Sequence, residues 1–190
     1  MSARKFLSCG KSLLIAVGIA IIAGVAFLYS GLYPMGADVP HNALTYWGLE
    51  TLRERSILRA ASDIDVPKDL DISTRLLRGG ADYNDMCASC HLTPNKKQSD
   101  FSLGLYPTPP NLSLNNDEDG HGSHSDEIYT QQRHFWIIKH GIKASGMPAW
   151  GIGHDDERIW DMVAFLKRLP ELSPQQYQIL TARGDSSKGH

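Results

Sequence analysis

Residues 86–91, with the sequence MCASCH, bring together three side chains whose types and spacing suit chemistry. Cys87 and Cys90 are three positions apart, and His91 follows the second cysteine directly. Three kinds of site use such a pattern: a redox-active dithiol, half of a zinc site, and a point of covalent cofactor attachment. Each of them requires different companions elsewhere in the chain, so the rest of the sequence decides between them.

The companions of a dithiol or a zinc site are missing from the sequence. A thioredoxin-like dithiol lies near a strand–helix–strand pattern, which is not found here, and a structural zinc site needs four ligands. The only other cysteine, Cys9, precedes a long apolar segment and is interpreted as an incidental free thiol. The C-x-x-C-H pattern is the attachment signature of c-type haem. It predicts one haem c per chain, bound covalently by Cys87 and Cys90, with His91 as an axial iron ligand.

An apolar segment near the N-terminus predicts a membrane anchor. No charged residue occurs between Lys11 and Asp38, and residues 13–33 are almost wholly apolar or small. As a helix this segment spans roughly 30 Å, the thickness of a bilayer core. Basic residues precede it, so the positive-inside rule predicts a cytoplasmic N-terminus and an exported remainder. We therefore expect a single-pass protein of the bacterial cytoplasmic membrane, in contact with membrane lipid, with its haem domain on the periplasmic side.

A cleaved signal peptide is the alternative interpretation of this segment. Gly24, Val25 and Ala26 offer the small-x-small pattern of a cleavage site. However, Phe27 and the two residues after it continue the apolar run, which favours an uncleaved anchor. Both interpretations export the rest of the chain.

The sequence after the anchor predicts an all-α chain. Residues 42–61 place apolar side chains at mostly helical spacing, which indicates an amphipathic helix followed by a linker. Further helices are predicted from residue 73 through the MCASCH motif, from about residue 125 to Gly141, and from residue 154 to the residues before Pro170. No alternating strand pattern of useful length interrupts them.

Four parts of the chain follow from this pattern. They are an anchor or signal peptide (1–37), an amphipathic helix and linker (38–72), a small haem domain (73–172) and a C-terminal tail (173–190). Within the haem domain, residues 93–123 are predicted to be irregular. A loop of that length is unusual in a compact domain unless something such as a large apolar cofactor fills its centre.

Residues 73–172 resemble the class I monohaem cytochromes c of bacteria. Members of that family place a glycine and an aromatic residue where their N-terminal helix crosses their C-terminal helix, and Gly79 and Tyr83 stand in those positions. The last helix offers suitable partners: Trp160, Val163 and Phe165. The resemblance implies that a loop methionine is the second axial ligand, and the sequence SGMPAWG supplies Met147 there.

The chain departs from this family at one position of the motif. Many relatives follow the histidine with glycine, and this chain has Leu92. By the same resemblance, Pro94 is expected to give backbone support to His91.

Other side chains are weaker candidates for the sixth iron ligand. Met86 adjoins Cys87 and cannot reach the opposite face of the haem, and Met162 lies inside a predicted helix, where a core role explains it. His134 and His140 lie on a predicted helix and are interpreted as structural. Met147 therefore remains the predicted ligand. Separately, residues 115–124 could hold a divalent ion, although a solvated acidic loop explains their composition better.

Together these features predict electron transfer. A histidine and a methionine on the iron leave no open position for a substrate, and no catalytic residues accompany the haem. We expect single electrons to pass from a quinol-oxidising complex or a dehydrogenase to a terminal oxidase or reductase. The alternatives are a permanent subunit of one such complex, and a haem gas sensor or peroxidase with an open iron position. The formal charge of −2 gives no indication of nucleic-acid binding.

Overall fold

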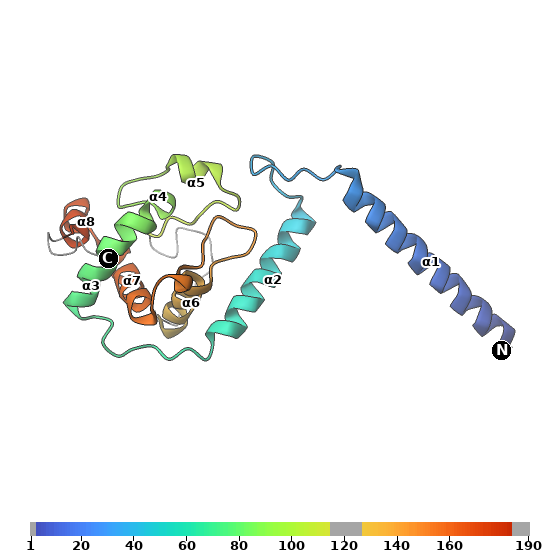
Figure 1. The fold of residues 1–190 in the computed structure, drawn as a ribbon, viewed down its shortest axis with the longest axis horizontal. Helices are drawn as coiled ribbons and strands as arrows, with labels where there is room; N and C mark the ends of the chain where they lie inside the picture. The colour runs from blue at the N-terminus through green and yellow to red at the C-terminus, as the bar shows by residue number, and fades with distance from the viewer. Residues whose placement is uncertain (1–2, 115–126, 184–190) are drawn as a thin grey trace. The chain divides into compact units, whose positions relative to one another are not determined.

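The computed structural model describes residues 3–114 and 127–183. Its contacts divide the chain into two compact units, Met1–Val39 and Pro40–His190. Every regular element in the described residues is a helix, and no strand occurs among them (Figure 1). The predicted all-α fold, with one apolar helix ahead of a helical domain, is confirmed.

The first unit is built on one long helix, α1 (Ala3–Ser30). Its part from Gly10 to Ser30 has a mean hydropathy of 2.5, and its side chains are not buried against other parts of the protein. These 21 residues are long and apolar enough to cross a bilayer. The helix ends at Ser30, and the next residue, Gly31, has a φ of +66° in the left-handed region that glycine adopts without strain.

The second unit contains the remaining helices. They are α2 (Ala43–Ala61), α3 (Ser73–Met86), α4 (Ala88–His91), α5 (Asp100–Gly104), α6 (Glu127–His140), the short 3₁₀ helix η1 (Trp150–Ile152), α7 (Asp156–Arg168), a second 3₁₀ helix η2 (Leu169–Glu171) and α8 (Pro174–Thr181). The longer predicted helices are all present, although the predicted start of α6 lies outside the described residues. Two short helices were not predicted: α5, in the stretch expected to be irregular, and α8, after Pro170.

The core of this unit forms where α3 crosses α7. A Cβ on Gly79 of α3 would lie 1.9 Å from the backbone oxygen of Asp161, so only glycine allows the two helices to approach so closely. One turn further along α3, the buried ring of Tyr83 lies 5.3 Å from that of Phe165 on α7. The predicted crossing is therefore confirmed, and it supplies the rigid frame from which the candidate site is built.

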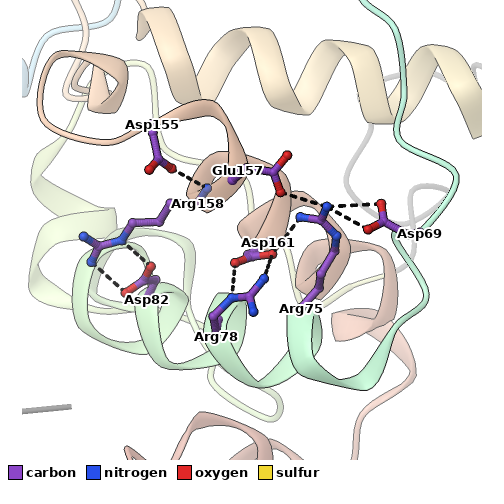
Figure 2. A network of polar contacts seen from close by, with 8 residues as sticks. All are labelled: Asp69, Arg75, Arg78, Asp82, Asp155, Glu157, Arg158 and Asp161. Atoms are coloured by element: carbon purple, nitrogen blue, oxygen red, sulfur yellow. Dashed lines mark hydrogen bonds and ion pairs between the residues drawn. The ribbon is translucent and has the colours of Figure 1, made fainter.

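A buried carboxylate fastens the two crossing helices together. Asp161 is 3% exposed, and its Oδ1 accepts a hydrogen bond from Nη1 of the buried Arg75 at 2.9 Å. Arg78, one turn further along α3, donates to the same carboxylate (Figure 2). Two further carboxylates, those of Asp69 and Glu157, pair with Arg75. Because each buried charge has a charged hydrogen-bonding partner, the network fixes how α3 and α7 are aligned.

The amphipathic helix α2 packs on α6 through one of its faces. Ile57 and Ala61 are buried in this contact. Beside them, the Glu54 carboxylate accepts a hydrogen bond from the Arg133 guanidinium at 3.0 Å. The linker after α2 is held as well, because the Gln132 side chain donates to the backbone oxygen of Ile64 at 2.8 Å. One face of α2 is thus an integral part of the second unit.

Candidate functional site

The MCASCH motif forms a tight turn at the end of α3. The helix ends at Met86, and Cys87 still donates its backbone N–H to Tyr83 at 2.9 Å. The following short helix α4 carries Cys90 and His91, and the His91 N–H bonds back to the Cys87 oxygen at 2.8 Å. Both thiols are free and half-buried. The two sulfurs therefore belong to one fixed turn that starts from the core crossing.

The surroundings of this turn do not suit a redox dithiol or a zinc site. Burial raises the pKa of the Cys87 thiol to about 12, with a smaller contribution from nearby acidic groups. Reactive dithiols and zinc ligands require the thiolate, so their pKa values are lowered instead. Among the residues that the structure describes, no group of three or more His, Cys, Asp and Glu side chains could hold a metal ion. Two thiols on one turn, that of Cys87 with a raised pKa, fit covalent attachment better.

The imidazole of His91 is held by one backbone oxygen. Its Nδ1 lies 2.9 Å from the carbonyl oxygen of Pro110, to which it donates when the ring is neutral. Burial lowers the pKa of His91, although the bond to Pro110 acts in the opposite direction, so the ring is neutral at neutral pH. Among the described residues Nε2 has no hydrogen-bond partner, and this nitrogen is available for a metal. The predicted support from Pro94 is wrong, because Pro110 provides it.

Leu92 takes a backbone conformation that usually favours glycine. Its φ is +69°, in the left-handed region, where a leucine side chain is strained. Two contacts hold it there: the Tyr83 hydroxyl donates to its carbonyl oxygen at 2.6 Å, and its side chain is 2% exposed. The chain turns here through a positive φ, which the glycine of many relatives adopts without strain and which this leucine also adopts. Here packing and a hydrogen bond offset the strain.

Met147 lies in the loop between α6 and η1. Gly141 ends α6 with a φ of +64°, and a Cβ there would lie 2.7 Å from the carbonyl carbon of Pro148. Ile142 donates its N–H to the Met147 oxygen at 3.1 Å, and the Ser145 hydroxyl accepts the Met147 N–H at 3.1 Å. The Met147 side chain is partly buried against the core. The backbone around this methionine is thus held on both sides.

The rival sulfur ligands have other partners in the structure. Met162 is 1% exposed inside α7 and belongs to the core. The sulfur of Met86 lies 3.2 Å from Nε2 of His154. These contacts explain both side chains without a role at a metal.

The rival histidines lie at different depths on α6. Burial lowers the pKa of His134 to about 4, with smaller contributions from Arg133 and His91, so this ring is neutral. His140 is exposed at the end of the helix, where its ring lies 5.1 Å from that of Trp136. The acidic loop at residues 115–124 lies outside the described residues.

Three segments that are distant in the sequence meet at the motif. The attachment turn contacts the segment after it through the bond from His91 to Pro110, and it contacts the Met147 loop region through Met86 and His154. The segment after the motif and the Met147 loop also lie close together: a Cβ on Gly146 would be only 2.6 Å from the Leu105 side chain. All three segments add partly buried apolar side chains to the edge of the core: Met86, Cys87, Ala88, Leu112, Met147 and Trp150.

This arrangement fits a haem in its donor atoms and in its surroundings. The turn offers two thiols and an aimed imidazole, the loop offers a thioether, and the half-buried apolar side chains suit a large apolar ring. Residues 74–166 match the family model described as "Cytochrome C oxidase, cbb3-type, subunit III". Residues 74–166 are a c-type cytochrome domain. No curated protein and no solved structure matches the chain.

The identification has two direct consequences. The cytochrome domain binds haem c covalently, and its chemistry is the transfer of electrons with redox partners. Sequence reasoning missed two side contacts of the site, the Pro110 carbonyl and the His154 imidazole. Nothing in the local pattern marks a backbone oxygen as the partner of His91. His154 directly precedes the acidic start of α7, so it reads as part of a helix N-terminus.

Proposed function

We propose that Cys87 and Cys90 form the two thioether bonds to the haem, and that His91 and Met147 are the axial ligands of its iron. The observation that carries this proposal is the aimed His91 ring, because its bond to Pro110 leaves Nε2 available. When bound, the haem supplies an iron that accepts and releases one electron. The two cysteines would hold the haem by one edge, the Pro110 carbonyl would orient the His91 imidazole, and the Met147 thioether would occupy the other axial position.

We further propose that the protein is tethered to the outer face of the bacterial cytoplasmic membrane by α1. The length and hydropathy of Gly10–Ser30 support this tether, and the basic residues before it support a cytoplasmic N-terminus. Electrons would then pass from a quinol-oxidising complex or a dehydrogenase to a terminal oxidase or reductase. Two protein ligands leave no iron position for a substrate, which favours electron transfer over gas sensing or a peroxidase reaction.

A second candidate is a permanent subunit of a larger complex. It is favoured by the family model, whose description names a subunit of an oxidase. Purification in mild detergent distinguishes the two: a carrier elutes with a single haem-stained chain, whereas a subunit elutes with stoichiometric larger chains.

Covalent attachment is tested by replacing the two cysteines together, Cys87→Ala with Cys90→Ala. Wild-type protein keeps its haem stain after denaturing electrophoresis, and we expect the double variant to lose it completely. Cys9→Ser is the matched control and should keep the stain. Haem that stays on the double variant would refute the assignment of the attachment residues.

The tether is tested on protein recovered from membranes. We expect it to require detergent for extraction and to retain its N-terminus. Soluble chains that begin at Phe27 would instead support the cleaved signal peptide, and would leave the cytochrome assignment intact.

A further inference from the structure

Tyr106 connects the segment after the motif to the chain that leads into α2. Both belong to the second unit. The Tyr106 hydroxyl accepts a hydrogen bond from the backbone N–H of His41 at 3.2 Å, and the two rings meet edge-on with their centroids 5.2 Å apart. Tyr106 is half-buried, and its partner is 65 residues away in the sequence. This contact therefore fixes two distant segments to each other at one point.

The residue before Tyr106 packs on the loop that carries Met147. A Cβ on Gly146 would have three atoms of the Leu105 side chain as its nearest neighbours, the closest of them at 2.6 Å. Gly146 directly precedes Met147 in the chain. The Leu105 side chain therefore limits how far the backbone at Met147 can move toward it.

The start of α2 gives the Tyr106 contact a fixed point. Asn42 caps the helix, and its side chain accepts the backbone N–H of Thr45 at 3.0 Å, so the chain passes from His41 directly into a regular helix. The later part of α2 is fastened to α6 by the buried Ile57 and by an ion pair. The Tyr106 hydroxyl is thus bonded to a part of the chain that is itself held.

We propose that Tyr106 is a positioning residue for the methionine ligand, and that residues 40–61 act as a brace of the haem site. The proposal rests on the ligation of the iron by Met147 proposed above. A thioether leaves the iron when its loop opens locally, so contacts that restrain the loop slow this opening. The restraint passes from the brace to Tyr106 and then through Leu105 to the loop.

The brace lies outside residues 74–166, which match the cytochrome family model. The part of this chain that controls the iron ligand is accordingly longer than the matched domain. Loss of the brace should loosen the methionine without changing any residue of the motif or of the Met147 loop.

The experiment measures how fast the Met147 loop opens in the full-length, haem-loaded ferric protein. Excess imidazole takes the iron position once the thioether leaves it, so at saturating imidazole the far-red sulfur-to-iron band disappears at the rate of opening. Tyr106→Phe removes the hydroxyl and keeps the ring. The matched control is Tyr177→Phe, because the Tyr177 hydroxyl donates to the Asn84 side chain at 3.1 Å and joins α8 to α3 instead.

We expect Tyr106→Phe to lose the band roughly two- to tenfold faster than wild type, the size that fits one hydrogen bond. Tyr177→Phe should keep the wild-type rate. An unchanged rate in Tyr106→Phe would overturn the proposal, and so would equal acceleration in both variants, because it would reflect a general loss of stability. Wild-type protein without the band would refute Met147 as the ligand and the brace with it, whereas a normal band with an unchanged rate refutes only the brace.

A second set of variants tests whether Tyr106 acts through His41. His41→Pro removes the backbone N–H that the Tyr106 hydroxyl accepts, and it is measured alone and together with Tyr106→Phe. If this hydrogen bond carries the effect, His41→Pro accelerates the loss of the band by itself but adds little to Tyr106→Phe. Accelerations that multiply in the double variant would show that the two residues act independently, which would overturn the brace.

Discussion

Gly79, Tyr83 and Phe165 are buried where α3 crosses α7, whereas the side chains of His91 and Met147 are half-buried. At the crossing, helix meets helix with only the hydrogen of Gly79 between them, and the charge of Asp161 is neutralised by two arginines. In the segments with the proposed iron ligands, residues 87–92 and 141–150, one hydrogen bond to a backbone oxygen orients the His91 ring, and the Ser145 hydroxyl accepts the backbone N–H of Met147. The crossing is held by contacts within the protein, while the segments of His91 and Met147, our proposed iron ligands, are less fully packed.

This difference predicts two separable effects of mutation. Changes at the crossing should lower the free energy of unfolding of the domain whether or not the haem chemistry is intact. Changes in the ligand segments should alter the spectrum while the helices stay folded. The expected effects on stability decrease from the crossing to the ligand loop.

Gly79→Ala should have the largest effect. Its Cβ would lie 1.9 Å from the Asp161 oxygen, and two helix backbones cannot move apart without opening the core. We expect a loss of about 3 kcal/mol or more in the free energy of unfolding, measured by denaturant titration of far-ultraviolet circular dichroism. Gly48→Ala in α2 is the matched control, since its Cβ would meet nothing within 4 Å and should leave stability equal or slightly raised. Equal stability of the two variants would contradict the account of the crossing.

Asp161→Ala should have the next largest effect. It leaves Arg75 buried at the crossing with only its partners at the surface end of the network, Asp69 and Glu157. Removing one partner of a buried ion pair is strongly destabilising, and the remaining carboxylates reduce the loss to about 2–3 kcal/mol. The comparison is Asp71→Ala, which breaks an exposed pair with Lys167 and should cost less than about 1 kcal/mol. Similar losses in the two variants would show that burial does not strengthen the network.

The contact between α2 and α6 should depend weakly on pH. Burial raises the pKa of Glu54, but the ion pairs with Arg133 and Arg53 outweigh it and hold the pKa below its usual 4.5. A carboxyl group with a lowered pKa stabilises the fold above the unfolded value and loses this contribution as pH falls through the folded value. Glu54 is also partly exposed, so its contribution is at most about 1 kcal/mol.

The measurement compares wild type with Glu54→Gln by denaturant unfolding. We expect wild type to be more stable at pH 7 and the difference to close as pH falls below 4.5 and through the lower pKa of the folded state. If the difference in stability between the two proteins did not change with pH, the charge of Glu54 would make no contribution to the free energy of unfolding.

The sequence predicted the crossing better than the ligand segments, for physical reasons. The resemblance to class I cytochromes c assigned Gly79 and Tyr83 to a helix crossing, and the acidic start and basic end of α7 mark its limits. His91 and its partner Pro110 are 19 residues apart, and the partner atom is a backbone oxygen that every residue possesses. Such a pairing follows only from the folded loop.

The two missed helices illustrate different limits. α5 has five residues, too few to show an apolar period, and only its N-terminus is set by reciprocal hydrogen bonds between Ser99 and Ser102. α8 did leave a signal, because Ser173, Pro174 and Gln176 form a capping box with proline in the first turn. That pattern was sufficient to predict a helix where only a tail was expected.

The central claim is that Met147 and His91 complete the coordination of the iron, and the spectrum of Met147→Ala tests it most directly. Ferric wild type should show the weak far-red band of sulfur-to-iron charge transfer, and the ferrous protein should bind carbon monoxide poorly. Met162→Ala is the matched control: this methionine is fully buried in the core, so the variant should keep the band while losing about 2–5 kcal/mol of stability. We predict that Met147→Ala loses the band, binds carbon monoxide rapidly and remains folded. A band that persists in Met147→Ala, or wild-type protein that binds carbon monoxide as rapidly as the variant, would contradict the assignment of Met147 and with it the electron-transfer account.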